Sequence, residues 1–405
     1  MINTPLINNC KALYFKTDKF STISLAINSF EELKDSVKFE EKNIIFNALG
    51  NLRKEQLKTK FDFDTARYFI SSTNMYFNNQ FRTYGTRIIH PKFTSNGIDY
   101  LEDIIYNLVD FSNLKDSLSE LHFNKAKQDM ILRIQQQRSN PFSYSAARLL
   151  ENIFDNKRYG TEILGNLEIY KALSFPDKKC IETYLNYFNN QNKQIFILGD
   201  ISEDLLPLDT YNPIVHSQPL IVNRNFESID RRIDNVNQTI ITLGFYFGPI
   251  QSYKEYLTIQ LIDSTLGKYG HSKLFDQLRN KDVSIYHIIT RYDSMNNILL
   301  VSICVPYDYE DKVKDKIIKS ILEFESHPVD LEMAKQFFMN EIYYLLDTPE
   351  GTMSYFNILN RFSISLNDIQ HNMSQITYEN FSDFVSNRME YIGMHILRGS
   401  AYEKD

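Results

Sequence analysis

The order of apolar and polar residues along the chain predicts alternating strands and helices. In the first half, Ile23, Leu25 and Ile27 are separated by single residues, which is the spacing of a strand with one buried face. The same reasoning then predicts two helices and a stretch of strands, over about residues 40–54, 64–72 and 75–90.

The second half of the chain repeats this order. Its pattern predicts a strand, two helices and two strands, over about residues 237–247, 253–266, 272–279, 283–289 and 298–305. In each half a long helix follows, beginning near Phe123 and near Leu331. Both long helices are expected to break, at Pro141 and Pro349, because proline has no amide hydrogen to donate inside a helix. Each half is expected to close with a helix and a strand, from Pro176 and over 194–198, and over 378–388 and 393–397.

A direct comparison of the two halves supports a duplication. At an offset of 208 positions, seven of the 29 residues from Ala126 to Phe154 are identical without a gap, where chance would give about two. We therefore expect two homologous α+β domains, residues 1–205 and 233–405, each a mostly antiparallel sheet with helices packed on one face. Residues 206–232 are predicted to be a linker, because their first part contains three prolines and no helical pattern.

Composition excludes several classes of protein. The net charge is −7 and the basic residues are scattered, whereas a nucleic-acid-binding protein needs a basic face. No apolar run approaches the roughly 18 residues of a membrane helix, and the first ten residues lack a signal-peptide pattern, so a cytoplasmic location is expected. Three cysteines, Cys10, Cys180 and Cys304, are odd in number and far apart, and are expected to be buried thiols.

The most informative segment is Gly270–Asp293, which sets Arg279 seven residues before Tyr286 across a predicted helix-to-strand junction. Arginine carries a rigid, permanently charged set of five donors, and tyrosine adds a hydroxyl on a stiff ring. Together they could hold the carbonyl groups of a peptide backbone. On residue frequencies alone, a solvated helix-end charge and an ordinary strand aromatic would be the usual explanation.

The element order, the duplication and this segment resemble the pitrilysin or insulinase family of zinc peptidases, which includes the mitochondrial processing peptidases. The resemblance spans nearly the whole chain. Its most specific part lies in the second domain, at Leu266, Gly267, Ser272, Lys273, Leu274, Phe275, Arg279, Lys281, Ser284 and Tyr286. It implies that Arg279 and Tyr286 face a catalytic zinc site across a cavity and help to hold the scissile peptide.

Active members of that family carry an HxxEH motif on the first long helix, where two histidines bind zinc and the glutamate acts as the base. The corresponding helix here reads FEEKNIIFNALGNLRK and contains no histidine, and the closest two of the eight histidines are 16 residues apart. Glu40 and Glu41 lie at the N-terminus of this helix, where negatively charged carboxylates interact favourably with the helix dipole. No catalytic residue, metal site or cofactor is therefore expected in this chain, and it should be inactive alone.

Two functions remain open. In the first, the chain is the substrate-binding subunit of a heterodimeric zinc metallopeptidase. It supplies Arg279 and Tyr286 to a zinc site on a homologous HxxEH-containing partner, and the substrate is a peptide such as a leader or a bacteriocin precursor. In the second, it is a scaffold or binding protein of the same fold without proteolysis. Retention of Arg279 and Tyr286 favours the first function.

Overall fold

A computed structural model describes residues 10–399, apart from residues 33–37, 62–66, 77–78, 90–100, 191–192, 201–220, 232–237, 269–273, 275–277, 279–284, 295, 308 and 323–327. Its first five strands form one sheet with the order β1-β5-β2-β4-β3. β1 runs parallel to β5, and the other neighbouring strands are antiparallel. The strands are β1 (Cys10–Lys16), β2 (Thr22–Glu32), β3 (Arg67–Tyr76), β4 (Asn79–Ile89) and β5 (Lys193–Gly199).

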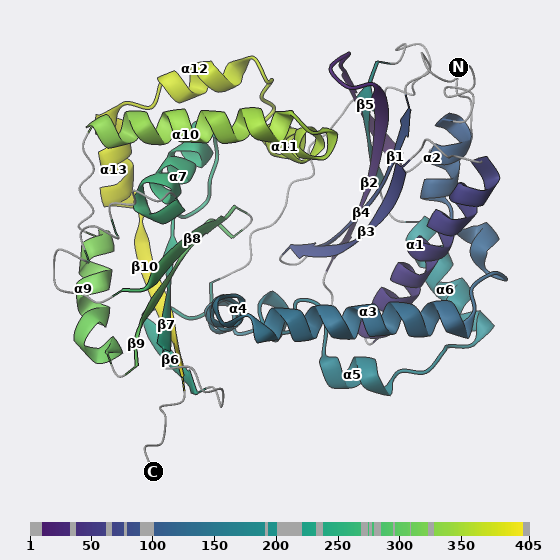
Figure 1. The fold of residues 1–405 in the computed structure, drawn as a ribbon, viewed down its shortest axis with the longest axis horizontal. Coiled ribbons are helices and arrows are strands. Elements are labelled where there is room, and N and C mark those ends of the chain that lie inside the picture. Colours follow the sequence, from purple (N-terminus) through teal and green to yellow (C-terminus); the bar gives the residue numbers. More distant parts are fainter. Residues whose placement is uncertain are drawn as a thin grey trace. The chain divides into compact units, whose positions relative to one another are not determined.

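The other five strands repeat this topology in a second sheet, with the order β6-β10-β7-β9-β8. Here β6 is parallel to β10, and the remaining pairs are antiparallel. The strands are β6 (Phe226–Arg231), β7 (Gln238–Tyr246), β8 (His287–Asp293), β9 (Ile298–Pro306) and β10 (Glu390–Arg398). The identical order, including the parallel strand at one edge, confirms the predicted α+β fold of two homologous halves (Figure 1).

Helices follow the same duplication. The first half contains α1 (Phe39–Phe61), α2 (Leu101–Val109), α3 (Glu120–Ser139), α4 (Pro141–Phe154), α5 (Leu167–Ala172) and α6 (Lys178–Asn189). The second contains α7 (Tyr253–Asp263), α9 (Glu310–Leu322), α10 (Pro328–Leu346), α11 (Pro349–Arg361), α12 (Asp368–Ser374) and α13 (Tyr378–Arg388). The two predicted breaks are confirmed, because α4 and α11 each begin at a proline, Pro141 and Pro349.

Each sheet buries one face under helices of its own half. In the first sheet, Ile23, Leu25 and Ile27 of β2 pack against α1 side chains such as Ile44 and Leu49. Their alternation is the reason that the strand could be predicted, since every second residue of a strand points to the same face. The second sheet does the same with residues such as Ile241 and Leu243 of β7, Val301 and Ile303 of β9, and Ile259 and Ile262 of α7.

Two compact units result, and each takes a segment from the other half of the sequence. Residues 136–163, with α4, belong to the unit of the second sheet, and residues 347–354, at the start of α11, belong to the unit of the first. These segments are equivalent in the duplication, since Pro141 and Pro349 are 208 positions apart. The predicted domains 1–205 and 233–405 did not include this exchange, and their boundaries stay a prediction.

Three local expectations differ from the structure. The stretch predicted as a helix over 64–72 contributes to β3, because Tyr68, Phe69 and Ile70 are residue types that suit a pleated strand and pair with β4. Residues 226–231 of the predicted linker form β6, whose burial alternates along FESIDR. β1 was not predicted at all. Most of the predicted helix over 272–279 lies outside the described residues, although Leu274 and Leu278 are helical and buried.

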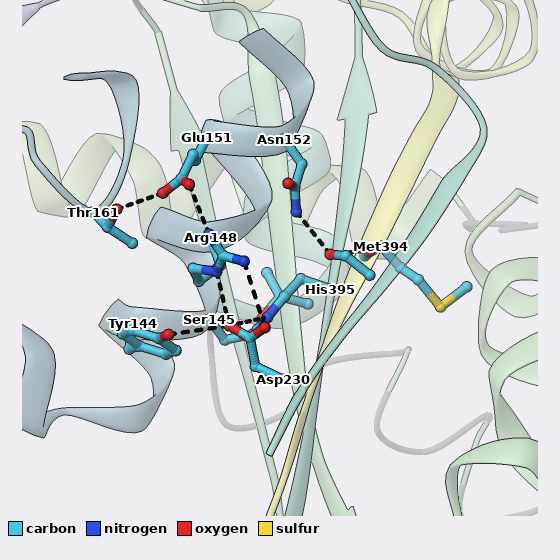
Figure 2. A network of polar contacts seen from close by, with 11 residues as sticks. Tyr144, Ser145, Arg148, Glu151, Asn152, Thr161, Asp230, Met394 and His395 are labelled. Atoms are coloured by element: carbon cyan, nitrogen blue, oxygen red, sulfur yellow. Dashed lines mark hydrogen bonds and ion pairs between the residues drawn. The ribbon is translucent and has the colours of Figure 1, made fainter. Parts of the chain in front are cut away.

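A buried polar cluster joins the exchanged helix α4 to the second sheet (Figure 2). The hydroxyl of Ser145 lies 2.8 Å from that of Thr242 on β7 and 2.9 Å from Nδ1 of His395 on β10. Thr242 in turn lies 3.0 Å from the Ser302 hydroxyl on β9. Ser145, Thr242 and His395 are fully buried. The cluster therefore ties α4 to three neighbouring strands.

Asp230 on the edge strand β6 binds two further polar residues of α4 beside this cluster. Its carboxylate accepts hydrogen bonds from the Tyr144 hydroxyl at 3.0 Å and from Arg148 Nε at 2.7 Å. Arg148 also pairs with Glu151 at 2.7 Å. The Nε2 atom of His395 lies 3.4 Å from Asp230 without an aligned hydrogen bond. Protonation of His395 would place a further charge in this buried site, and burial disfavours that charge more than the nearby Asp230 stabilises it.

The charge state of His395 should make the stability of this unit depend on pH. Burial lowers the pKa of His395 to about 4, although Asp230 acts in the opposite direction. The unfolded chain binds a proton at this histidine near its ordinary pKa of 6.5, and the folded chain does not until about 4. Between these values the unfolded state binds more protons, so the free energy of unfolding should decrease as pH falls. Thermal unfolding at pH values from 7 to 4 measures this.

The matched control is His395→Gln, whose amide can still bond to Ser145 but does not titrate. Its unfolding temperature should depend less on pH over the same interval. An identical pH dependence in the variant and the original protein would contradict the assignment to His395.

Candidate functional site

The first long helix, α1, carries residues at the HxxEH spacing that cannot perform its chemistry. The segment Asn43–Asn47 reads NIIFN, so that asparagine stands at both histidine positions of this spacing and Phe46 at the glutamate position. A neutral amide is a poor zinc ligand, since zinc prefers imidazole, thiolate and carboxylate. Phenylalanine has no proton acceptor. The missing histidines were evident from the sequence, whereas the role of these three residues becomes clear from their contacts.

The contacts of these residues show that the position is built into the core. The Asn43 amide donates to the Tyr170 hydroxyl at 2.8 Å. The Asn47 amide donates to the Asn43 carbonyl at 2.8 Å and lies 3.7 Å from the Met130 sulfur on α3. The Phe46 ring is buried and lies 5.0 Å from the Phe188 ring. Each side chain is thus used for packing or hydrogen bonding within the fold.

The two glutamates at the start of α1 are also engaged in structural contacts. Glu40 accepts a hydrogen bond from the Asn166 backbone at 2.9 Å, and Glu41 accepts one from the Tyr184 hydroxyl at 2.9 Å. Burial, reinforced by Glu41, raises the pKa of Tyr184. Within the described part of the chain, no group of three or more histidine, cysteine, aspartate or glutamate residues is arranged to hold a metal ion. The residues present on α1 and α3 do not fit zinc.

A small pocket remains between α1 and α3 at this place. Its volume is about 40 Å³, which is enough for a few water molecules but not for a peptide. Its lining combines Phe46, Asn47 and Asn51 of α1 with Ala126, Asp129, Met130 and Arg133 of α3. The pocket therefore offers no substrate site of its own.

Tyr286, one of the two predicted binding residues, lies directly before β8 at the edge of the second sheet. Its backbone amide donates to the Cys304 carbonyl on β9 at 2.9 Å, which fixes the main chain. Its side chain is 58% exposed, and so its hydroxyl lies in reach of solvent. Among the described residues, β8 pairs only with β9. A fixed backbone with an exposed phenol is suited to hold a ligand.

Arg279, the other predicted binding residue, lies outside the described residues. The structure therefore does not test whether its guanidinium approaches Tyr286. The preceding residue, Leu278, is helical and fully buried.

The exchanged helix α4 adds a feature beside β8 that was not predicted from the sequence. The Phe142 ring packs edge-on against the His287 ring, with ring centroids 5.9 Å apart. His287, Ile289 and Arg291 are exposed and alternate along β8. The first turn of α4 therefore lies next to the exposed face of this strand. The signal in the sequence was Pro141, which predicts that a new helix begins there but not on which sheet it packs.

The cluster under α4 contains serine, histidine and aspartate, the residue types of a hydrolase triad. Ser145 and His395 are completely buried, so that no substrate can reach the serine hydroxyl. Ser145 also shares its hydroxyl with Thr242 rather than presenting it to a cavity. We therefore assign this cluster a structural role.

The cysteines are consistent with thiols that do not take part in chemistry. Cys304 is buried and Cys180 is half-buried, and both are free. Burial raises the pKa of each thiol, which reduces the thiolate fraction available for reaction. The side chain of Cys10 lies outside the described residues.

Among the described helices, none is long and apolar enough to cross a membrane.

Comparison with known proteins agrees with this geometry. Residues 178–337 match the model of the family described as the peptidase M16 inactive domain. A relative from Bacillus subtilis, the antilisterial bacteriocin subtilosin biosynthesis protein AlbE, is 36% identical over 386 residues, which cover 95% of this chain and 98% of that protein.

Solved structures extend the match to the whole fold. A conserved protein from Enterococcus faecalis V583 superposes with a TM-score of 0.79 at 15% identity, covering 99% of both chains. A peptidase M16 inactive domain from Pseudomonas fluorescens gives a TM-score of 0.70 at 12% identity, over 96% of this chain and 95% of that one. With the duplicated sheets and the absent HxxEH motif, these matches show that the chain belongs to the M16 peptidase family as a non-catalytic member.

Proposed function

We propose that this chain is the non-catalytic, substrate-binding subunit of a heterodimeric zinc metallopeptidase that acts on peptides. The partner is a homologous HxxEH-containing chain, which holds the zinc and performs the hydrolysis. This chain supplies Arg279 and Tyr286 to the divided site. The observation that carries the proposal is an exposed Tyr286 with a fixed backbone, in an M16 chain whose α1 reads NIIFN in place of a zinc motif.

The two side chains suit the task chemically. A guanidinium and a phenol both donate hydrogen bonds, and neither has to change its protonation state to bind a carbonyl oxygen. Donors placed at the oxygen that becomes negative when the peptide bond is attacked lower the barrier by roughly 3 kcal/mol each. β8 adds main-chain groups beside Tyr286, and an extended peptide can pair with the edge of a sheet. Binding of the peptide by Arg279 and Tyr286 therefore needs no metal-binding residue in this chain.

The proposed substrate class is supported by the relative that matches nearly the full length. AlbE is described as a bacteriocin subtilosin biosynthesis protein, and we extend this to the present chain as a peptide substrate of the leader or bacteriocin-precursor type. Such a substrate is flexible and can adopt the extended conformation that an edge strand requires.

A catalytically dead scaffold is the alternative function. It would equally retain the packing of Phe46 against Phe188 in place of a zinc motif. A scaffold would not depend on the hydroxyl of Tyr286, so the two functions differ in a measurable way.

The first test is turnover by the assembled pair. With assembly intact, Arg279→Ala and Tyr286→Phe should each lower kcat/KM for a peptide substrate by roughly 100-fold, because each removes one donor to the developing negative charge. Tyr187→Phe is the matched control: Tyr187 is also an exposed tyrosine, at 44% exposure, but it lies on α6. Unchanged turnover in both the Arg279→Ala and the Tyr286→Phe variant would favour the scaffold function.

The second test is metal content. The purified chain alone should contain no stoichiometric zinc and show no peptidase activity, whereas its mixture with the HxxEH-containing chain should contain zinc and cleave peptide. Treatment of the mixture with 1,10-phenanthroline should abolish cleavage, and added zinc should restore it. Elemental analysis by mass spectrometry measures the metal. Zinc-dependent cleavage by this chain alone would refute the proposal.

A further inference from the structure

The main chain is irregular at Tyr286, where the second sheet gains one extra residue. The register pairs His287 with Cys304, and the backbone amide of Tyr286 donates to the carbonyl of the same Cys304 at 2.9 Å. Two residues of one strand therefore oppose a single residue of its neighbour. This is the arrangement of a β-bulge, which changes the direction of a side chain relative to the regular strand.

Burial along the segment agrees with a bulge at this position. Ile285 and Ile288 both pack into the core of the second unit, although they are three residues apart and a regular strand would direct them to opposite faces. Tyr286 and His287, which lie between them, are both exposed. The bulge therefore places Tyr286 on the side of the sheet where His287 lies, away from that core.

Beyond His287 the strand alternates regularly along the edge of the sheet (Figure 1). His287, Ile289 and Arg291 are exposed, whereas the residues between them are buried. Tyr286 thus stands at one end of a row of exposed side chains. We call this the β8 row, and its members are Tyr286, His287, Ile289 and Arg291.

Arg291 is the permanently charged member of the β8 row. Among the residues that the structure describes, it forms no ion pair or hydrogen bond through its side chain. Asp293, the next acidic residue along the strand, instead accepts hydrogen bonds from the backbone amide and the side chain of Asn296. Four other arginines of the second unit do pair with carboxylates: Arg148, Arg224, Arg388 and Arg398.

The first turn of α4 adds positive potential at the other end of the row. Asn140 is the N-cap of this helix, and its first turn contains no acidic residue. The N-terminal end of a helix carries a partial positive charge, and the contact of Phe142 with His287 places this end beside β8. The chain as a whole has a net charge of −7. A negatively charged ligand is therefore favoured at the β8 row, although the net charge of the chain disfavours it elsewhere.

We infer that the β8 row determines substrate specificity, and that Arg291 binds the carboxylate of an aspartate or glutamate in the peptide that Tyr286 holds. This inference rests on the proposed function, since it names the class of peptide bound at that site. A guanidinium and a carboxylate can form two parallel hydrogen bonds, which makes the pair specific in geometry as well as in charge. Ile289, which is 37% exposed, offers an apolar contact between the two polar ends of the row.

The geometry of β8 defines where the acidic residue lies in the peptide. From His287 to Arg291 the strand advances by about 14 Å, at roughly 3.4 Å per residue. An extended peptide advances at nearly the same rate, so an acidic residue at Arg291 is about four or five residues from a scissile bond held beside Tyr286. The peptide residue that passes Ile289 should be apolar.

The experiment measures which peptides the assembled pair of chains cleaves. The probe is a library of peptides prepared by chymotrypsin from a bacterial proteome, and mass spectrometry identifies the bonds that are cut. Aspartate and glutamate should be enriched at one position, about four or five residues from the cleaved bond. Arg291→Glu should replace this preference by one for lysine and arginine, and should lower kcat/KM for an acidic peptide by about tenfold.

Arg231→Glu is the matched control. Arg231 is also exposed and lies at the end of β6, at the opposite edge of the same sheet. The same change of charge there should leave the preference unaltered. Arg291→Lys keeps the charge but loses the planar fork of donors, so it should retain a weaker preference for acidic residues. Circular dichroism and the unfolding temperature establish that each variant is folded.

The outcomes separate this inference from the proposed function. If the original pair cleaves peptides without an acidic preference, or if Arg291→Glu keeps that preference, the inference is refuted, while loss of turnover in Tyr286→Phe would still support the proposed function. If the pair cleaves no peptide, both are refuted. If Arg291→Glu prevents assembly with the partner instead of changing the preference, the β8 row is a subunit interface and the inference is refuted.

Discussion

The structure depends on how the second face of each sheet is covered. A five-stranded sheet packed on its own helices leaves one face exposed, and apolar residues on that face would otherwise meet water. In the second unit, Ile240, Cys304 and Leu397 on that face pack with Phe142 and Tyr144 of α4. In the first unit, Ala26, Phe196 and Leu198 pack with Met353 of the equivalent segment. The two halves of the sequence therefore complete each other's cores.

The buried cluster around Ser145 fixes how α4 lies on its sheet. An apolar contact is not directional, whereas a hydroxyl shared between Thr242 and His395 is satisfied in one position of the helix only. The equivalent residue of the other exchanged segment is Met353, which makes an apolar contact instead. The two exchanged segments therefore occupy equivalent places in the topology, but one is held by a polar cluster and the other by an apolar contact.

Much of this fold could be predicted from local patterns. β2, α13 and the helix starts at Pro141 and Pro349 were predicted because alternation and proline act on the neighbouring residues directly. The exchange of α4 could not be predicted, since helical periodicity shows that one side is buried but not on which sheet. The start of β3 was mistaken for a helix although Tyr68, Phe69 and Ile70 suit a strand, because a short run of apolar residues has no clear period until its pairing with β4 is known. Of the candidate site, a strand at Tyr286 could be predicted from alternation, but its place at the edge of the sheet could not, because the strand order depends on pairing between distant segments.

The two units solve the same folding problem with the same topology, so that differences between equivalent positions are not consequences of the fold. In α1 of the first unit, the positions at the zinc-motif spacing are filled by Asn43, Phe46 and Asn47, which stabilise the core. In the second unit, Tyr286 is 58% exposed directly before the edge strand β8, while its backbone is held by the Cys304 carbonyl. The zinc-motif positions of the first unit are therefore used for packing, whereas an aromatic side chain beside the edge strand of the second unit is left exposed at a cost in solvation.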